Sequence, residues 1–99
     1  MPDYKLTNKA VADLSGIWNY TIDTWSEKQA DKYYQMLLDN FTEIAENPTI
    51  GKSYSGIANH LFGLKAGRHI IFYRKLKDGF VEITRILHEQ MDLKNRVND

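Results

Sequence analysis

Arginine side chains within two apolar runs of the C-terminal half are the first candidates for chemistry. Arg68, Arg74 and Arg85 lie in or beside segments rich in isoleucine, valine, phenylalanine and tyrosine. A guanidinium group offers a planar fork of donors that fits phosphate oxygens and can stabilise a phosphoryl transition state. The alternative is that Arg74 and Arg85 form ion pairs with Glu82 or Glu89 of the same segment. The residue pattern leaves both interpretations open.

The three histidines do not form a metal-binding motif. His60, His69 and His88 are too scattered for His-x-x-x-His spacing, and the chain has no cysteine to complete a ligand set. No metal and no cofactor are therefore expected. We expect His69 to be structural or half exposed on an open sheet face. For His88, beside Glu89, a contact or chemical role and a local hydrogen bond are both open.

Two short motifs lack the residues that would make them catalytic. Gly51-Lys52-Ser53 has the ending of a phosphate-binding loop, but Glu46 stands where the upstream glycine is needed. Ser53 and Ser55 are not in a Gly-x-Ser-x-Gly elbow, so serine-hydrolase chemistry is not expected. The sequence alone therefore contains no recognisable catalytic set.

The positions of the arginines and histidines depend on a predicted β-hairpin. Asp78-Gly79 is a strong turn signal that separates predicted strands over 68–76 and 80–87. Gly67 turns the chain into this hairpin from a preceding predicted strand over 61–66. Three consecutive strands of this kind predict a meander.

An amphipathic helix is predicted near the N-terminus. Residues 4–6 alternate as a short strand, and Thr7 or Asn8 can cap a helix of about 17 residues. The predicted core-facing stripe recurs every three or four positions and comprises Val11, Leu14, Ile17, Trp18, Ile22 and Trp25.

A second helix is predicted directly after the first. Ser26-x-x-Gln29 is a capping-box pattern, and the helix should end at Asn47-Pro48 because proline disfavours helical geometry in the residue before it. Its apolar stripe comprises Ala30, Tyr33 or Tyr34, Leu37, Phe41 and Ile44. Because the joint is so short, the two helices must double back as an antiparallel hairpin.

Together these elements predict an α+β two-layer domain with the order β-α-α-β-β-β. The helix hairpin is expected to pack on one face of an antiparallel sheet of about four strands. Residues 49–60 are predicted to be a surface loop, and the tail is either one helical turn packed by Met91 and Leu93 or a fraying arm. A chain of 99 residues has room for a single domain, 1–99.

Composition and charge argue against several functional classes. The chain begins without a basic and then apolar leader, and no apolar run approaches the ~18 residues that span a bilayer. A cytoplasmic protein without membrane contact is therefore expected. The net charge of zero argues against generic nucleic-acid binding, and no direct sequence-specific nucleic-acid binding is expected. Residues 1–47 hold four basic and eight acidic side chains, whereas 48–99 hold nine and five. This asymmetry is either ordinary surface charge or a basic half that faces an acidic partner.

Large aromatic side chains are concentrated on the predicted helices. Trp18, Tyr20, Trp25, Tyr33 and Tyr34 are expected mostly in the core and flank of the helix hairpin, but one stripe on each helix cannot bury them all. Some aromatic area should stay exposed for a partner, such as a segment that folds on binding.

The segments GRHIIFYR (67–74) and VEITRILHEQMDL (81–93) resemble the C-terminal signature of the ParE branch of the RelE/ParE toxin family. The resemblance covers nearly the whole chain, since the family shares the order of a short strand, two helices, three strands and a tail. It implies the toxin half of a bacterial type II toxin–antitoxin pair. Such a toxin binds DNA gyrase, stalls it on cleaved DNA without catalysis of its own, and is neutralised by a cognate ParD-type antitoxin.

Two groups of contact residues are expected from this resemblance. The end of the last strand and the tail are expected to bind the target through Arg85, His88, Met91, Asp92 and Arg96. The exposed sides of the helix hairpin and the adjacent sheet edge are expected to bind the antitoxin through Trp25, Tyr33 and Tyr34.

Two other functions remain open. One is a ribosome-dependent mRNA interferase of the RelE type, in which Arg68, Arg85 and His88 would cleave RNA. The chain departs from that branch because it has no tyrosine after Tyr73, and a neutral net charge gives little attraction for RNA phosphates. The other is an inactive module that only sequesters an antitoxin.

Overall fold

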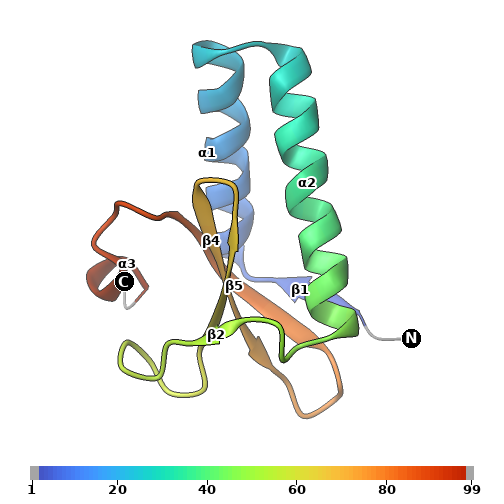
Figure 1. Ribbon diagram of the computed structural model, residues 1–99, viewed down its shortest axis with the longest axis vertical. Coiled ribbons are helices and arrows are strands. Elements are labelled where there is room, and N and C mark those ends of the chain that lie inside the picture. Colours follow the sequence, from blue (N-terminus) through green and yellow to red (C-terminus); the bar gives the residue numbers. More distant parts are fainter. Residues whose placement is uncertain (1–2, 98–99) are drawn as a thin grey trace.

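Two long helices lie across one face of a five-stranded sheet in the computed structural model of the chain, which describes residues 3–97 (Figure 1). The helices are α1 (Asn8–Thr24), α2 (Glu27–Glu46) and the short α3 (Leu93–Val97). The strands are β1 (Tyr4–Leu6), β2 (Lys52–Ser53), β3 (Phe62–Ala66), β4 (His69–Lys75) and β5 (Val81–His88). The predicted α+β class and the helix hairpin over a sheet are confirmed.

Both predicted helix starts are confirmed by their caps. Thr7 Oγ1 accepts a hydrogen bond from Ala10 N, and Ser26 Oγ accepts one from Gln29 N, each at 3.1 Å. Only Trp25 and Ser26 separate the two helices, so the chain doubles back at once. Near this joint the hairpin extends beyond the sheet (Figure 1).

The sheet-facing side of α1 differs from the predicted stripe. Ala10 and Leu14 are buried there, and Ile17 packs against the same core. Three residues of the predicted stripe are instead exposed: Val11 (50%), Ile22 (36%) and Trp25 (71%). The prediction was wrong for these residues because the apolar side chains of α1 occupy two adjoining faces, of which the sheet covers one. On the other face, Trp18 packs edge-on against Tyr34 of α2, with ring centroids 5.6 Å apart.

The strand order in the sheet is β1-β5-β4-β3-β2. β3, β4 and β5 form the predicted antiparallel meander. One edge differs from the predicted arrangement, because β1 pairs in parallel with β5 and places Tyr4 opposite Val81. Parallel pairing needs a long crossover, which the segments between these two strands supply. At the other edge, β2 is a two-residue strand within the predicted loop.

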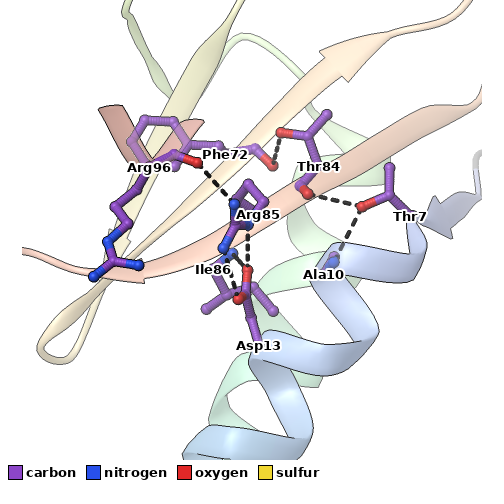
Figure 2. A network of polar contacts seen from close by, with 8 residues as sticks. All are labelled: Thr7, Ala10, Asp13, Phe72, Thr84, Arg85, Ile86 and Arg96. Atoms are coloured by element: carbon purple, nitrogen blue, oxygen red, sulfur yellow. Dashed lines mark hydrogen bonds and ion pairs between the residues drawn. The ribbon is translucent and has the colours of Figure 1, made fainter. Parts of the chain in front are cut away.

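A β-bulge interrupts β5 at Thr84. The register pairs Tyr73 with Ile83 and Phe72 with Arg85, so Thr84 is the extra residue. Thr7 Oγ1 donates a hydrogen bond to Thr84 O at 2.7 Å, which ties the bulge to the start of α1 (Figure 2). Because of the extra residue, Ile83 and Ile86 both reach the core beneath the helices.

The face of the sheet away from the helices is also covered. Ile70 and Phe72 alternate with the helix-facing residues of β4 and form a second buried cluster with Leu61 and Leu87. The residues packed on this cluster are Tyr54, Ile57, Ala58, Leu93 and Val97. The helical alternative for the tail is therefore confirmed, although Leu93 packs without Met91, which is 44% exposed.

Candidate functional site: a cationic groove

A groove of about 1110 Å³ opens beside the part of the helix hairpin that extends past the sheet. Its walls come from α1, α2, the β3–β4 turn, the end of β5 and the tail. Its large apolar lining residues include Ile17, Tyr20, Trp25, Met36 and Met91. The groove is therefore an apolar surface that the sheet does not cover.

The charged lining of the groove is mainly cationic. Among the described residues, the cations in the lining are Lys32, Arg68, Arg85 and Arg96, and the one carboxylate is that of Asp13. Positive potential beside exposed aromatic area favours an occupant that combines acidic and apolar side chains.

Asp13 of α1 and Arg85 of β5 form an ion pair in the groove wall (Figure 2). Arg85 Nε donates to Asp13 Oδ2 at 2.8 Å, and Nη2 donates to Oδ1 at 3.1 Å. Asp13 Oδ2 also accepts a hydrogen bond from Ile86 N at 3.0 Å. The side chains of Arg85 and Asp13 are 14% and 15% exposed, so this bidentate pair is largely shielded from water.

The ion-pair partners predicted for Arg85 were wrong. Arg85 pairs with Asp13 rather than with Glu82 or Glu89, and Glu89 pairs with Lys65 of β3 at 2.9 Å. The reason is that β1 pairs with only the first three residues of β5. Beyond them β5 is an edge strand, and α1 lies beside it and supplies the carboxylate.

Arg85 also fastens the tail. Its Nη1 donates to Arg96 O at 2.7 Å, while Leu93 and Val97 pack on the second buried cluster. Nε and both terminal nitrogens of Arg85 thus donate hydrogen bonds within the molecule. The geometry of Arg85 is that of a positioning residue, which holds α1, β5 and α3 together.

Tyr33, His69 and His88 form a second polar cluster in the groove. Tyr33 Oη lies 2.6 Å from His69 Nδ1 and accepts a hydrogen bond from Arg68 N at 3.0 Å. His69 and His88 are partners across the β4–β5 ladder, with ring centroids 5.4 Å apart. His88 Nδ1 accepts a hydrogen bond from Gln90 N at 3.1 Å.

The surroundings of this cluster favour its uncharged form. Burial lowers the pKa of His69 below the ordinary value of 6.5, and the nearby His88 lowers it further. Burial also raises the pKa of the Tyr33 phenol. His69 is half-buried on the helix-facing side of the sheet, so the structural alternative for this residue is confirmed and the open-face alternative was wrong.

The groove brings together residues from both predicted contact groups. From the antitoxin group it contains Trp25 and Tyr33, and from the target group Arg85, His88, Met91 and Arg96. Two predicted residues lie outside the lining. Tyr34 packs against Trp18, and Asp92 Oδ2 accepts a hydrogen bond from Asn95 Nδ2 at 2.6 Å.

Sequence reasoning missed Asp13 and His69 as parts of this site. Each meets its partner only through the tertiary fold: Asp13 and Arg85 are 72 residues apart, and Tyr33 and His69 are 36 apart. A weak signal exists for Asp13, because a carboxylate beside buried positions of its own helix needs a donor.

Other kinds of site find no support in residues 3–97. No group of three or more histidine, aspartate and glutamate side chains is arranged to hold a metal ion in this part of the chain. In the loop that contains the Gly51-Lys52-Ser53 motif, Gly51 N donates a hydrogen bond to Tyr73 Oη at 2.9 Å, which holds the loop against the core. None of the described helices has the length and apolar composition needed to cross a bilayer.

The fold and the groove together define a class of protein. It is a small α+β domain in which a helix hairpin packs on a sheet and leaves a cationic surface uncovered near the end of the hairpin. A sequence profile described as the ParE toxin of the type II toxin–antitoxin system parDE matches residues 4–93. The chain belongs to the ParE toxin family, which implies an antitoxin as partner.

Three curated toxins align with this chain over nearly their full lengths. Toxin ParE1 of Mycobacterium tuberculosis is 37% identical over 90 residues, which are 91% of this chain and 92% of the relative. Toxin ParE1 of Caulobacter vibrioides is 34% identical and covers 95% of this chain and 96% of its own length. Toxin ParE of Escherichia coli is 31% identical over 99 residues.

A solved structure shares the fold. The chain of the chromosomal ParDE system from P. aeruginosa superposes with a TM-score of 0.75, covering 89% of this chain and 96% of its own. Sequence identity is 21%, so this likeness concerns the fold alone. Because the superposition covers most of both chains, the two proteins share the two-layer arrangement described above.

Proposed function

We propose that this toxin inhibits DNA gyrase by binding to it through the end of β5 and the tail. The observation that carries the proposal is the fixed tail: Arg85 holds Arg96 O at 2.7 Å, while the side chains of Met91 and Arg96 line the groove. A contact surface held in one geometry loses less conformational entropy on binding. Inhibition by binding also needs no catalytic group, and we infer that it takes place in the cytoplasm.

We also propose that a segment of a ParD-type antitoxin occupies the groove. Trp25 is 71% exposed and lines the groove together with three arginines, and tryptophan and arginine are typical of the residues that dominate binding energy. The lining cations favour an acidic amphipathic segment. Because Met91, Arg96 and His88 line the same groove as Trp25 and Tyr33, an occupant would cover part of the proposed gyrase-binding surface.

A gyrase assay tests the proposed target. Purified toxin is added to gyrase, ATP and relaxed plasmid, and both supercoiling and cleaved plasmid are measured. We expect inhibition at micromolar toxin with accumulation of cleaved DNA, and recovery when the cognate antitoxin is added in equal amount. Full supercoiling at these concentrations, from toxin that arrests growth in cells, would exclude gyrase as the target.

RNA cleavage is a second candidate because Arg68, His69 and His88 line one groove. Two adjacent imidazoles can serve as acid and base, and an arginine can bind the phosphate. A translation extract supplied with toxin tests this candidate. Codon-dependent cuts in mRNA that disappear with His88→Ala would favour it over gyrase inhibition, and intact mRNA at growth-arresting toxin levels would eliminate it.

A further inference from the structure

The histidine pair at the end of β4 and β5 points to regulation of the groove by pH. We propose that the His69–His88 pair is a proton-binding site that makes the groove bind its acidic occupant more tightly as the pH falls. The inference rests on the proposed function, in which an acidic antitoxin segment lies in the groove.

The geometry allows the pair to hold one proton more readily than two. His69 and His88 are direct cross-strand partners, and their rings meet edge to face with centroids 5.4 Å apart at 82°. Two imidazolium ions at this separation repel each other, so the second proton binds only at lower pH. The site therefore takes up its two protons in separate steps, each of which adds one positive charge to the groove wall.

Tyr33 can keep its hydrogen bond to His69 whether the imidazole is neutral or protonated. When His69 is neutral, the Tyr33 hydroxyl can donate to Nδ1 at 2.6 Å. After protonation Nδ1 donates to Tyr33 Oη, and the hydroxyl hydrogen turns to Ala66 O at 3.3 Å. His88 Nδ1 accepts a hydrogen bond from Gln90 N.

The charges around His69 explain why an acidic occupant would promote protonation. The groups near the pair or in the surrounding wall are Asp13 from α1, Lys32 and Tyr33 from α2, Lys65 from β3, Arg68 from the turn, and Arg85, Glu89 and Arg96 from β5 and the tail. The two carboxylates are already paired, Asp13 with Arg85 and Glu89 with Lys65. Carboxylates of an occupant would add negative charge beside these cations. Proton binding and occupant binding then favour each other by the same factor.

Proton NMR of the histidine rings tests the site on the full chain. Free toxin and its complex with the purified cognate antitoxin are titrated between about pH 7.5 and pH 5.5, a range in which ordinary carboxylates stay ionised. We expect His69 to titrate at a higher pH in the complex than in the free chain. A His69 midpoint that is unchanged or lower in the complex would overturn the proposal.

Measurements of antitoxin affinity at different pH values are the second test of the proposal. For uptake of one proton the dissociation constant can fall at most about tenfold per pH unit, so we expect tightening of several-fold over this range for the wild type. The double variant His69→Gln with His88→Gln should remove most of that dependence, and the exposed-loop control His60→Asn should keep it. An equal pH dependence in the double variant overturns the proposal but leaves the groove assignment intact. Binding unaffected by Trp25→Ala would instead overturn the groove assignment.

Discussion

Asp13 on α1 and Arg85 on β5 form a bidentate ion pair that joins the two layers of the domain at the groove wall. The same guanidinium reaches Arg96 O, and the same carboxylate accepts from Ile86 N. One pair of side chains therefore fixes the first helix, the last strand and the tail relative to one another. The shape of the groove depends on it.

Removing one partner of this pair should destabilise the domain. Asp13→Ala removes the carboxylate that accepts from Nε and Nη2 of Arg85 and from Ile86 N, and we expect a loss of about 2–4 kcal/mol in the free energy of unfolding. Urea denaturation measures this loss. The matched control is Lys5→Ala, which breaks an exposed ion pair with Asp78 at 3.1 Å and should leave the midpoint nearly unchanged. Similar midpoints for both variants would show that the Asp13–Arg85 pair contributes little.

The stability of the free toxin should fall as the solution becomes acidic. The pKa of His69 in the folded chain lies below the ordinary value of 6.5, so the unfolded chain takes up the proton first. The contribution of this group is complete above about pH 6.5 and is lost as the pH falls from there toward the folded pKa. Urea denaturation at successive pH values should show a smaller decline for His69→Gln than for His60→Asn. Equal declines in both variants would contradict the assignment.

The helices and turns could be predicted because their signals are local. Ser26 with Gln29 fixes one helix start, Thr7 fixes the other, and Asp78-Gly79 marks the turn of the hairpin. The groove could not be predicted in this way. Its walls depend on contacts between distant segments, and these exist only because β1 pairs with part of β5 and leaves the rest for α1.

The covered second face of the sheet has a similar cause. Residues 54–58 lack a regular hydrophobic period, so nothing in the sequence shows that Tyr54 and Ile57 pack under β4. The prediction of the buried stripe on α1 was wrong for a different reason. The apolar residues of α1 lie on two faces of the helix, and only the tertiary fold decides which face is buried.

Gly16 offers a way to separate stability from binding. It lies within α1, where an added Cβ would meet nothing within 4 Å, and it lines the groove. Gly16→Ala should therefore raise the free energy of unfolding by about 0.5–1 kcal/mol. It should also weaken antitoxin binding several-fold, because the methyl group projects into the space of the occupant.

Ser15→Ala is the matched control for Gly16→Ala, since Ser15 is exposed on the same helix but does not line the groove. It should stabilise the helix slightly and leave antitoxin affinity unchanged. Calorimetric titration measures both affinities. Equal affinities for the two variants would mean that the antitoxin does not enter the groove at Gly16.

The aromatic residues of the helix hairpin should differ in their effect on antitoxin binding. Trp25→Ala removes an exposed groove residue, and we expect at least tenfold weaker binding with an unchanged melting temperature. Tyr34→Asp should have a smaller effect, because Tyr34 lies outside the lining and contacts Trp18. Unchanged affinity for Tyr34→Asp, with a cooperative melt, would remove Tyr34 from the antitoxin-binding surface.

The most direct measurement compares gyrase inhibition by the wild-type toxin and by a tail variant that keeps the fold. Met91→Ala, Asp92→Ala and Arg96→Ala change three exposed side chains together and leave the hydrogen bond from Arg85 to the Arg96 carbonyl in place. Lys28→Ala, exposed on α2 outside the groove lining, is the control. With equal melting temperatures, we predict that the triple variant loses at least tenfold in inhibitory potency while the control retains it. Full potency in the triple variant would contradict binding through the tail.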